Sequence, residues 1–158
     1  MNVAWISRLT VEAMLAEADR RFPLETGGIL MGYISNQDIV ITDAIGPGRA
    51  AIHSRYSFTP DQDYHETEIA RLYESSNRKW VYLGDWHSHP NQFRPSMSRK
   101  DIETLRRIAR FRKARIVRPL MFIFGGEPDS WTPSIWQWEP GKFLRSKGKP
   151  VPLSIKSY

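Results

Sequence analysis

The chain has 158 residues and a net charge of +6, with 41% hydrophobic and 25% charged residues. This size and composition suit one globular domain with its own core and exclude a disordered or fibrous chain. The absence of cysteine excludes disulfides and thiolate ligation of a metal. No apolar run reaches the length of a membrane span, and the N-terminus has no signal-peptide pattern, so a cytoplasmic location is expected.

Apolar periodicity and turn residues predict strands that alternate with three helices. The expected helices are capped by Thr10, Thr59 and Ser98, and they end near Phe22, Ser75 and Arg115. Strands are expected at residues 3–6, 27–34, 39–44, 53–58, 80–87, 119–124 and 134–138. From Glu139 onward Pro, Gly, Lys and Ser become frequent, which predicts an extended or partly mobile tail. We therefore expect a mixed α/β domain over residues 1–138 and a C-terminal tail over residues 139–158.

Two of the four histidines lie at the end of an apolar strand. Residues 80–83 (W-V-Y-L) predict a buried strand that leads into His87 and His89. Because side chains two apart on a strand point to the same face, both imidazoles can meet at one point. Pro90 has no N–H group to donate, so the strand ladder is expected to stop there.

A carboxylate is predicted to lie close to these histidines. Ser98 is a plausible N-cap of the third helix, and Asp101 falls at its third position, from which the carboxylate can reach the strand end. Two histidines and one carboxylate suit zinc, and three protein ligands leave the fourth tetrahedral position to water, as in catalytic sites. A lone histidine is usually structural and Ser-x-x-Asp is usually only a cap. Their combination at the end of an apolar strand favours a metal site.

The order of these residues resembles the motif of the JAMM metalloproteases, also called JAB or MPN-plus. That motif is His-x-His-Pro, seven residues, then Ser-x-x-Asp, with a glutamate upstream near the end of the first helix. The chain has every position of it: Glu25, His87, His89, Pro90, Ser98 and Asp101. The resemblance covers roughly residues 10–124. It implies a curved mixed sheet flanked by helices, similar to the cytidine-deaminase-like fold.

The resemblance also implies a mechanism. One zinc ion would be held by His87, His89 and Asp101 and would lower the pKa of its water to about 7. Glu25 is the candidate general base that takes the proton of this water and gives it to the leaving amine. The alternative for Glu25 is an exposed acid beside a helix end. Ser98 either caps the helix or donates to the oxyanion on the attacked carbonyl, and the two roles are compatible.

Members of this family cleave peptide or isopeptide bonds after the C-terminal glycines of ubiquitin-like proteins. The G-D-W-H-S-H-P sequence and the small size are most similar to bacterial members that occur beside E1- and E2-like proteins, including those of antiphage (CBASS-like) operons. The implied partner is thus a ubiquitin-like or E1/E2-like protein substrate. A second prokaryotic group trims sulfur-carrier proteins. Other relatives lack the ligands and act as scaffolds, or are associated with nucleic acid.

Three further features have two interpretations each. Asp85 lies two residues before His87 and is either a hydrogen-bond acceptor for an imidazole N–H or a surface acid. His53 and His65 match no part of the motif, so they are expected to be structural or surface residues. The basic stretch 99–118 is either a patch for an acidic partner or nucleic acid, or a solvated helix face, and we favour the helix face. Phe93, in the loop 91–97, is expected to form one wall of the substrate groove.

Overall fold

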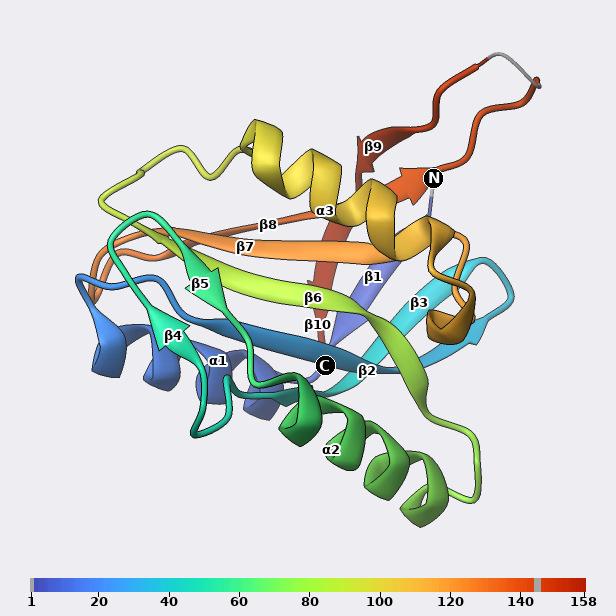
Figure 1. The fold of residues 1–158 in the computed structure, drawn as a ribbon, viewed down its shortest axis with the longest axis horizontal. Helices are drawn as coiled ribbons and strands as arrows, with labels where there is room; N and C mark the ends of the chain where they lie inside the picture. The colour runs from blue at the N-terminus through green and yellow to red at the C-terminus, as the bar shows by residue number, and fades with distance from the viewer. Residues whose placement is uncertain (1, 144–145) are drawn as a thin grey trace.

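The computed structural model describes residues 2–143 and 146–158, which form one large mixed sheet with three α-helices around it (Figure 1). The helices are α1 (Arg8–Arg21), α2 (Gln62–Ser75) and α3 (Arg99–Arg110), followed by a short 3-10 turn at Arg112–Ala114. The strands are β1 (Val3–Ile6), β2 (Gly27–Ser35), β3 (Asp38–Ile45), β4 (Ile52–His53), β5 (Phe58–Thr59), β6 (Val81–Pro90), β7 (Leu120–Gly126), β8 (Thr132–Glu139), β9 (Lys149–Pro152) and β10 (Ser154–Ser157). The predicted α/β fold class is confirmed.

The large sheet has the strand order β10-β1-β3-β2-β6-β7-β8-β9, and β4 and β5 form a separate small hairpin. Strand β6 is central: it pairs antiparallel with β2 on one side and parallel with β7 on the other. Only Leu153 separates β9 from β10, although these strands lie at opposite ends of the order. The sheet must therefore curve until its two edges come close, and the amide of Leu153 donates to the carbonyl of Ile135 in β8.

The helices cover the two faces of the sheet unequally. Met14 of α1 packs with Leu30, Leu83 and Phe122 in the largest core cluster. The other face carries two smaller clusters, one around Leu72 of α2 and one formed by Leu105, Met121, Ile123 and Trp138 under α3. Because side chains alternate along a strand, α1 covers one face, and α2 and α3 cover the other. The strip of β6 between α2 and α3 is consequently the place where its polar side chains Asp85, His87 and His89 lie.

Two glycines let neighbouring strands approach or bend. A side chain at Gly28 would collide with the carbonyl of Ile45 on β3, so only glycine permits this close packing of β2. Gly84 has φ +148° and lies where the pairing of β2 and β6 shifts register. Such a bulge changes which side chains of a strand face the same way. Here Leu83 and Trp86 both join the core under α1, and their neighbour Asp85 faces the other side.

Several predicted boundaries are wrong in informative ways. Helix α1 begins at Arg8, so Thr10 is not its cap; the Thr10 hydroxyl is instead buried and donates to the carbonyl of Thr42. The cap of α2 is Asp61 rather than Thr59, because the Asp61 carboxylate accepts from the amide of Tyr64.

Three other predicted elements also differ. The strand predicted at 53–58 is the β4–β5 hairpin, and α3 ends at Arg110 instead of continuing to residue 115. Strand β6 extends to Pro90, which is paired with Gly126 of the parallel strand β7.

The segment beyond residue 138 supplies β9 and β10 to the sheet. The domain boundary predicted after residue 138 stays a prediction. Over the described residues, no helix is both long enough and apolar enough to cross a membrane.

Candidate metal and catalytic site

The two histidines of the motif lie side by side on β6, on the sheet face shared with α2 and α3. The Nε2 atoms of His87 and His89 are 2.9 Å apart, and both side chains are buried. Between them Ser88 points to the opposite face and is fully buried, as is Trp86, whose indole N–H donates to the carbonyl of Ile45.

Asp101 reaches the histidines from the first turn of α3. Its Oδ1 is 3.2 Å from Nε2 of His87, and its Oδ2 is 3.4 Å from Nε2 of His89. A complete capping box holds this turn: the Ser98 hydroxyl accepts from the amide of Asp101 at 3.1 Å, and Oδ2 of Asp101 accepts from the amide of Ser98 at 2.7 Å. The same carboxylate thus caps the helix and faces both imidazoles.

These three side chains form a donor set that fits one metal ion. Their ligand atoms all lie within 4.8 Å of one another. A tetrahedral ion with bonds of about 2.0–2.1 Å requires donor atoms about 3.3 Å apart. The separations of 2.9, 3.2 and 3.4 Å are close to this value. The 3.2 Å separation is measured from Oδ1 and the 3.4 Å separation from Oδ2, and Oδ1 is the oxygen that does not accept from the Ser98 amide.

The electrostatics of Asp101 favour its ionised form. Burial alone would raise the pKa of this carboxyl, but hydrogen bonds and charge from His87 and His89, with the bond from Ser98, hold the pKa well below its ordinary value. The carboxylate is therefore ready to act as an anionic ligand.

Glu25 lies in the connection between α1 and β2, beside the donor set. Two residues later Gly27 is paired with His87 in the ladder of β2 and β6, which places this connection beside the histidine strand. Burial raises the pKa of the Glu25 carboxyl, while the charges of the two histidines partly oppose this effect. A half-buried carboxyl with a raised pKa suits proton transfer near neutral pH.

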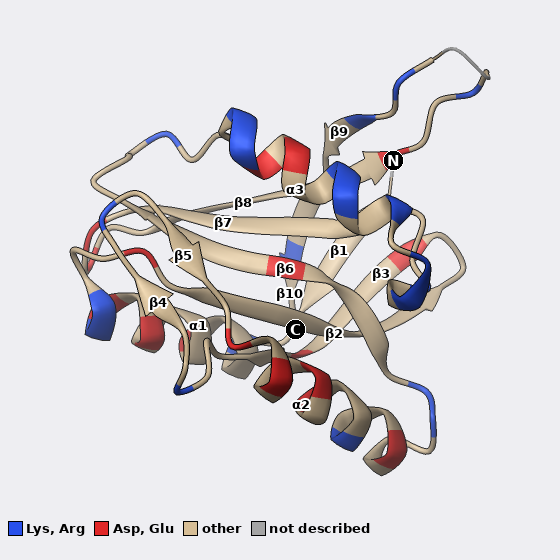
Figure 2. Ribbon diagram, viewed as in Figure 1, with Lys and Arg blue, Asp and Glu red and all other residues tan. Residues whose placement is uncertain are grey.

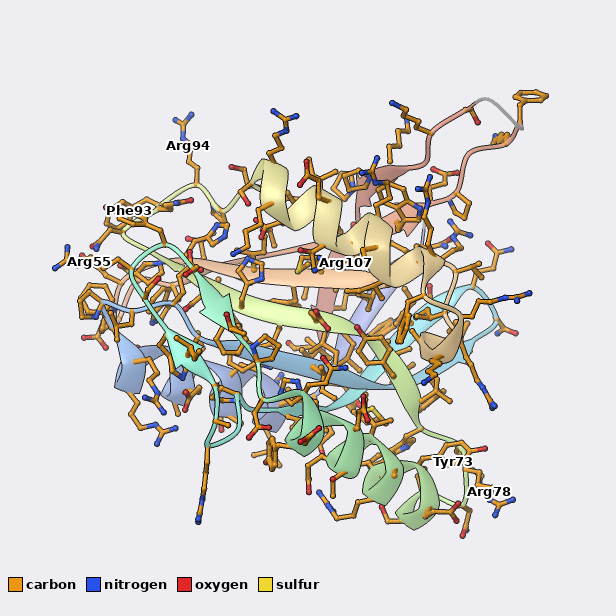
Figure 3. The ribbon with its side chains drawn as sticks, viewed as in Figure 1. Arg55, Tyr73, Arg78, Phe93, Arg94 and Arg107 are labelled. Atoms are coloured by element: carbon orange, nitrogen blue, oxygen red, sulfur yellow. The ribbon has the colours of Figure 1, made fainter. Side chains whose placement is uncertain are left out.

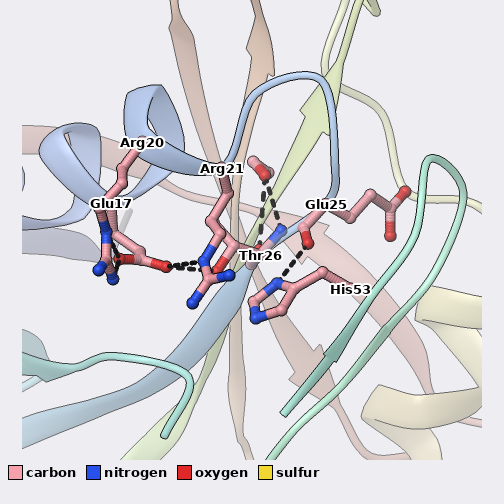
Figure 4. Close-up of polar contacts among 7 residues, drawn as sticks. Glu17, Arg20, Arg21, Glu25, Thr26 and His53 are labelled. Atoms are coloured by element: carbon pink, nitrogen blue, oxygen red, sulfur yellow. Dashed lines mark hydrogen bonds and ion pairs between the residues drawn. The ribbon is translucent and has the colours of Figure 1, made fainter. Parts of the chain in front are cut away.

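The main chain of Glu25 is held from the β4–β5 hairpin. Its amide donates to the carbonyl of Ser54 at 2.8 Å, and its carbonyl lies 2.8 Å from Nδ1 of His53 (Figure 4). Both backbone groups of this one residue are thus bound by the same small hairpin. The sequence analysis missed this role of His53, because a contact between residues 25 and 53 leaves no local pattern.

The next residue, Thr26, ties the same connection to the histidine strand and to α1. Its amide donates to the hydroxyl of Ser88 at 3.1 Å, and its carbonyl accepts from the amide of Ser88 at 2.9 Å. Its own hydroxyl donates to Glu17, which also pairs with Arg20 and Arg21 (Figure 4). Since Ser88 lies between the two histidines, these bonds fix the position of the Glu25 segment relative to the donor set.

The remaining sequence-predicted residues have other contacts. Asp85 accepts a hydrogen bond from the hydroxyl of Tyr82 at 2.7 Å, and within the described ranges it forms none with an imidazole. His65 has a structural contact, with Nε2 2.7 Å from the carbonyl of Gly46. Figure 3 shows Phe93 with Arg55 at one end of the molecule, and Phe93 is exposed. Its role as a groove wall stays a prediction.

Comparisons with known proteins agree with this geometry. Residues 8–138 match the family model described as prokaryotic homologs of the JAB domain. The chain is 45% identical over 136 residues to the probable metalloprotease y4qB of Sinorhizobium fredii, which covers 85% of this chain and 83% of that protein. It is 31% identical over 107 residues to a CD-NTase/cGAS isopeptidase of Escherichia coli, covering 68% of this chain and 65% of that protein.

The fold is also similar to a solved structure, the solution structure of protein DSY2949 from Desulfitobacterium hafniense. The TM-score is 0.68 at 20% sequence identity, and the match covers 98% of this chain and 94% of that one. The family match and the relatives confirm the resemblance seen in the sequence motif. The chain therefore belongs to the prokaryotic JAB family and is a hydrolase of the JAMM type.

Proposed function

We propose that this protein is a zinc-dependent isopeptidase or peptidase that cleaves after the C-terminal glycine of a ubiquitin-like protein or its conjugates. The observation that carries this proposal is the buried donor set of His87, His89 and Asp101 with the anchored, half-buried Glu25 beside it. Relatives named as a probable metalloprotease and as CD-NTase/cGAS isopeptidases support it.

In this proposal the metal ligands are Nε2 of His87, Nε2 of His89 and Oδ1 of Asp101. Zinc, when bound, supplies a Lewis acid that polarises the scissile carbonyl and makes a water molecule acidic. The Glu25 carboxylate accepts a proton from the attacking water and delivers it to the leaving amine nitrogen, so the proton count balances over the reaction.

Ser98 is the second catalytic residue of the proposal. Its hydroxyl oxygen accepts from the amide of Asp101 at 3.1 Å, and a side-chain hydrogen bond also links Ser98 to the Asp101 carboxylate. In this proposal the hydroxyl turns its proton from that carboxylate to the oxyanion that develops on the attacked carbonyl. The capping bond fixes the oxygen, so this donor is preorganised.

The substrate class follows from the relatives. Three of them are named CD-NTase/cGAS isopeptidases, which supports a conjugate as substrate and a bacterial antiphage pathway for this protein. The partner would then be a ubiquitin-like protein, alone or joined to an E1/E2-like or target protein. A flexible glycine-ended tail suits the site, because it can bind in an extended conformation without bulky side chains.

The test uses two reporters joined to the tail of a ubiquitin-like protein, one by a peptide bond and one through a lysine side chain. We expect cleavage after the last glycine, loss of cleavage with a chelator, and recovery on adding zinc. Glu25→Gln should keep zinc and slow turnover by about 10²–10⁴-fold. Cleavage of only a sulfur-carrier fusion would assign the protein to that substrate instead, and chelator-resistant cleavage would refute the metal mechanism.

A further inference from the structure

The positive charge of the protein is concentrated on α3 and on the segment after it. Residues 99–118 hold nine of the 23 Lys and Arg residues and only two of the 17 acidic residues, so the rest of the chain carries 14 basic and 15 acidic residues. Figure 2 shows basic positions along α3, whereas α2 is mostly acidic. The net charge of +6 therefore resides on one part of the surface.

Three arginines and a phenylalanine at the end of α3 line a cavity. Arg110 follows Arg107 by three residues and Arg106 by four, so it lies on the same side of the helix as both. With Phe111 and Glu103 they line a hollow of about 460 Å³. Phe111 is 52% exposed at this position, although it directly follows the last helical residue. We call the four residues Arg106, Arg107, Arg110 and Phe111 the α3 arginine pocket.

Two of the three arginine charges of the pocket have no partner in the part of the chain that the structure describes. Arg106 and Arg110 form no ion pair within the described ranges, and Glu103 is paired with Arg99 at 3.5 Å. Of the three arginines, Arg107 interacts electrostatically with an acid, the half-buried Asp85 of β6. Like charges at this spacing disfavour a helix. The helix dipole accounts for cations in the last turn of α3. It does not account for the further Lys and Arg residues between positions 112 and 118, or for the exposed ring of Phe111.

We propose that the α3 arginine pocket binds an acidic protein segment that carries an apolar side chain between its carboxylates. Planar guanidinium groups bind carboxylates in a bidentate manner, and Phe111 offers an apolar contact within the same hollow. A single-stranded nucleic acid would need a basic groove with several aromatic rings for stacking. One ring in a single open hollow fits a peptide side chain better.

The position of the pocket relates it to the metal site. Asp101 and Arg110 are the third and last residues of α3, and nine residues of helix span about 14 Å. About four residues of extended chain cover this distance. A protein held at the pocket could therefore place a short tail at the donor set. This binding goes beyond the proposed function and requires neither the metal nor turnover, so a failure of hydrolysis would leave it testable.

The experiment measures binding of a fluorescent peptide of alternating Glu and Leu residues by anisotropy at physiological salt. We expect saturable binding with and without chelator. Arg106→Glu/Arg110→Glu should weaken it by at least about tenfold, because two charge-assisted contacts are lost. The matched control is Arg8→Glu/Arg49→Glu, which changes the net charge equally at two exposed positions that form no ion pair with any described residue, and it should leave binding unchanged. Phe111→Ser, which leaves the charge unaltered, should weaken binding of this peptide but not of a Glu-Gly peptide.

Three results would overturn the proposal. An equal loss of affinity in the Arg8/Arg49 control would mean that only the overall charge matters. Equal binding of a Gln-Leu peptide would exclude carboxylate recognition. Tighter, Arg106- and Arg110-dependent binding of a thymidine oligonucleotide would assign the surface to nucleic acid instead of protein. Circular dichroism of each variant separates these outcomes from loss of the fold.

Discussion

The imidazole of His53 holds the carbonyl oxygen of Glu25, with Nδ1 at 2.8 Å. Because a carbonyl only accepts, Nδ1 must carry the proton. The other ring nitrogen, Nε2, is buried and has no hydrogen-bond partner among the described residues. The contribution of this side chain to the site therefore rests on one bond, and that bond acts on the main chain of the proposed general base.

Removing this bond should slow turnover without loss of metal. For His53→Leu we expect the main chain of Glu25 to shift. The value of kcat should then fall by roughly 10²-fold, because small displacements of reacting groups slow the reaction by this much. KM and zinc content should remain near those of the wild type. His53→Asn should recover most of the rate, since its amide nitrogen takes about the position of Nδ1. Equal rates for the Leu and Asn variants would show that the ring only fills space.

The raised pKa of Glu25 makes its ionised form unfavourable for the fold. The unfolded chain binds this proton with the ordinary pKa near 4.5, and the folded state binds it more tightly because burial penalises the charge. Stability should therefore fall as pH rises from 4.5 through the raised pKa, and the loss should be complete above it.

Glu25→Gln removes this titration. In metal-free protein at neutral pH the variant should melt at a higher temperature than the wild type, and the difference should shrink as the pH falls below 4.5. Thermal melts of both proteins with chelator present measure it, because a bound cation would lower the same pKa. A Gln variant that is less stable at neutral pH would contradict the sign of this shift.

The sequence predicts the donor set well because each part depends on a local rule. The spacing of His87 and His89 places both on one strand face, and the capping pattern places Asp101 in the first turn of α3. The structure brings these residues together as expected. Local patterns are sufficient wherever a residue is positioned by the strand or helix that contains it.

The contacts around Glu25 could not be predicted in this way. Thr26 meets Ser88 across 62 positions of sequence, and His53 meets Glu25 across 28. Such contacts depend on which strands become neighbours, and periodicity does not contain this information. The C-terminal strands illustrate the same limit, because Pro- and Lys-rich composition predicts a tail, whereas pairing with β8 and β1 places residues 149–157 in the sheet.

Loss of one ligand should remove the metal but not the fold. The largest core cluster lies under α1, on the face away from the donor set, so His89→Ala should stay folded. We expect zinc content to fall below one equivalent and activity to be lost. In the wild type, chelation should lower the melting temperature, because a ligand of the native state stabilises it by mass action. One tight equivalent of zinc in the Ala variant would refute the assignment of His89.

Ser98 combines two roles that different substitutions separate. Ser98→Ala removes the acceptor of the Asp101 amide, which should cost about 1 kcal/mol of stability, and it also removes the proposed oxyanion donor, worth about 10²–10³-fold in turnover. Ser98→Asp retains a cap but repels a developing negative charge. We therefore expect the Asp variant to be stable, zinc-bound and nearly inactive, by melting temperature, metal analysis and turnover. If the Asp variant is active as well as stable, Ser98 is only a cap, and the oxyanion must be held by other donors.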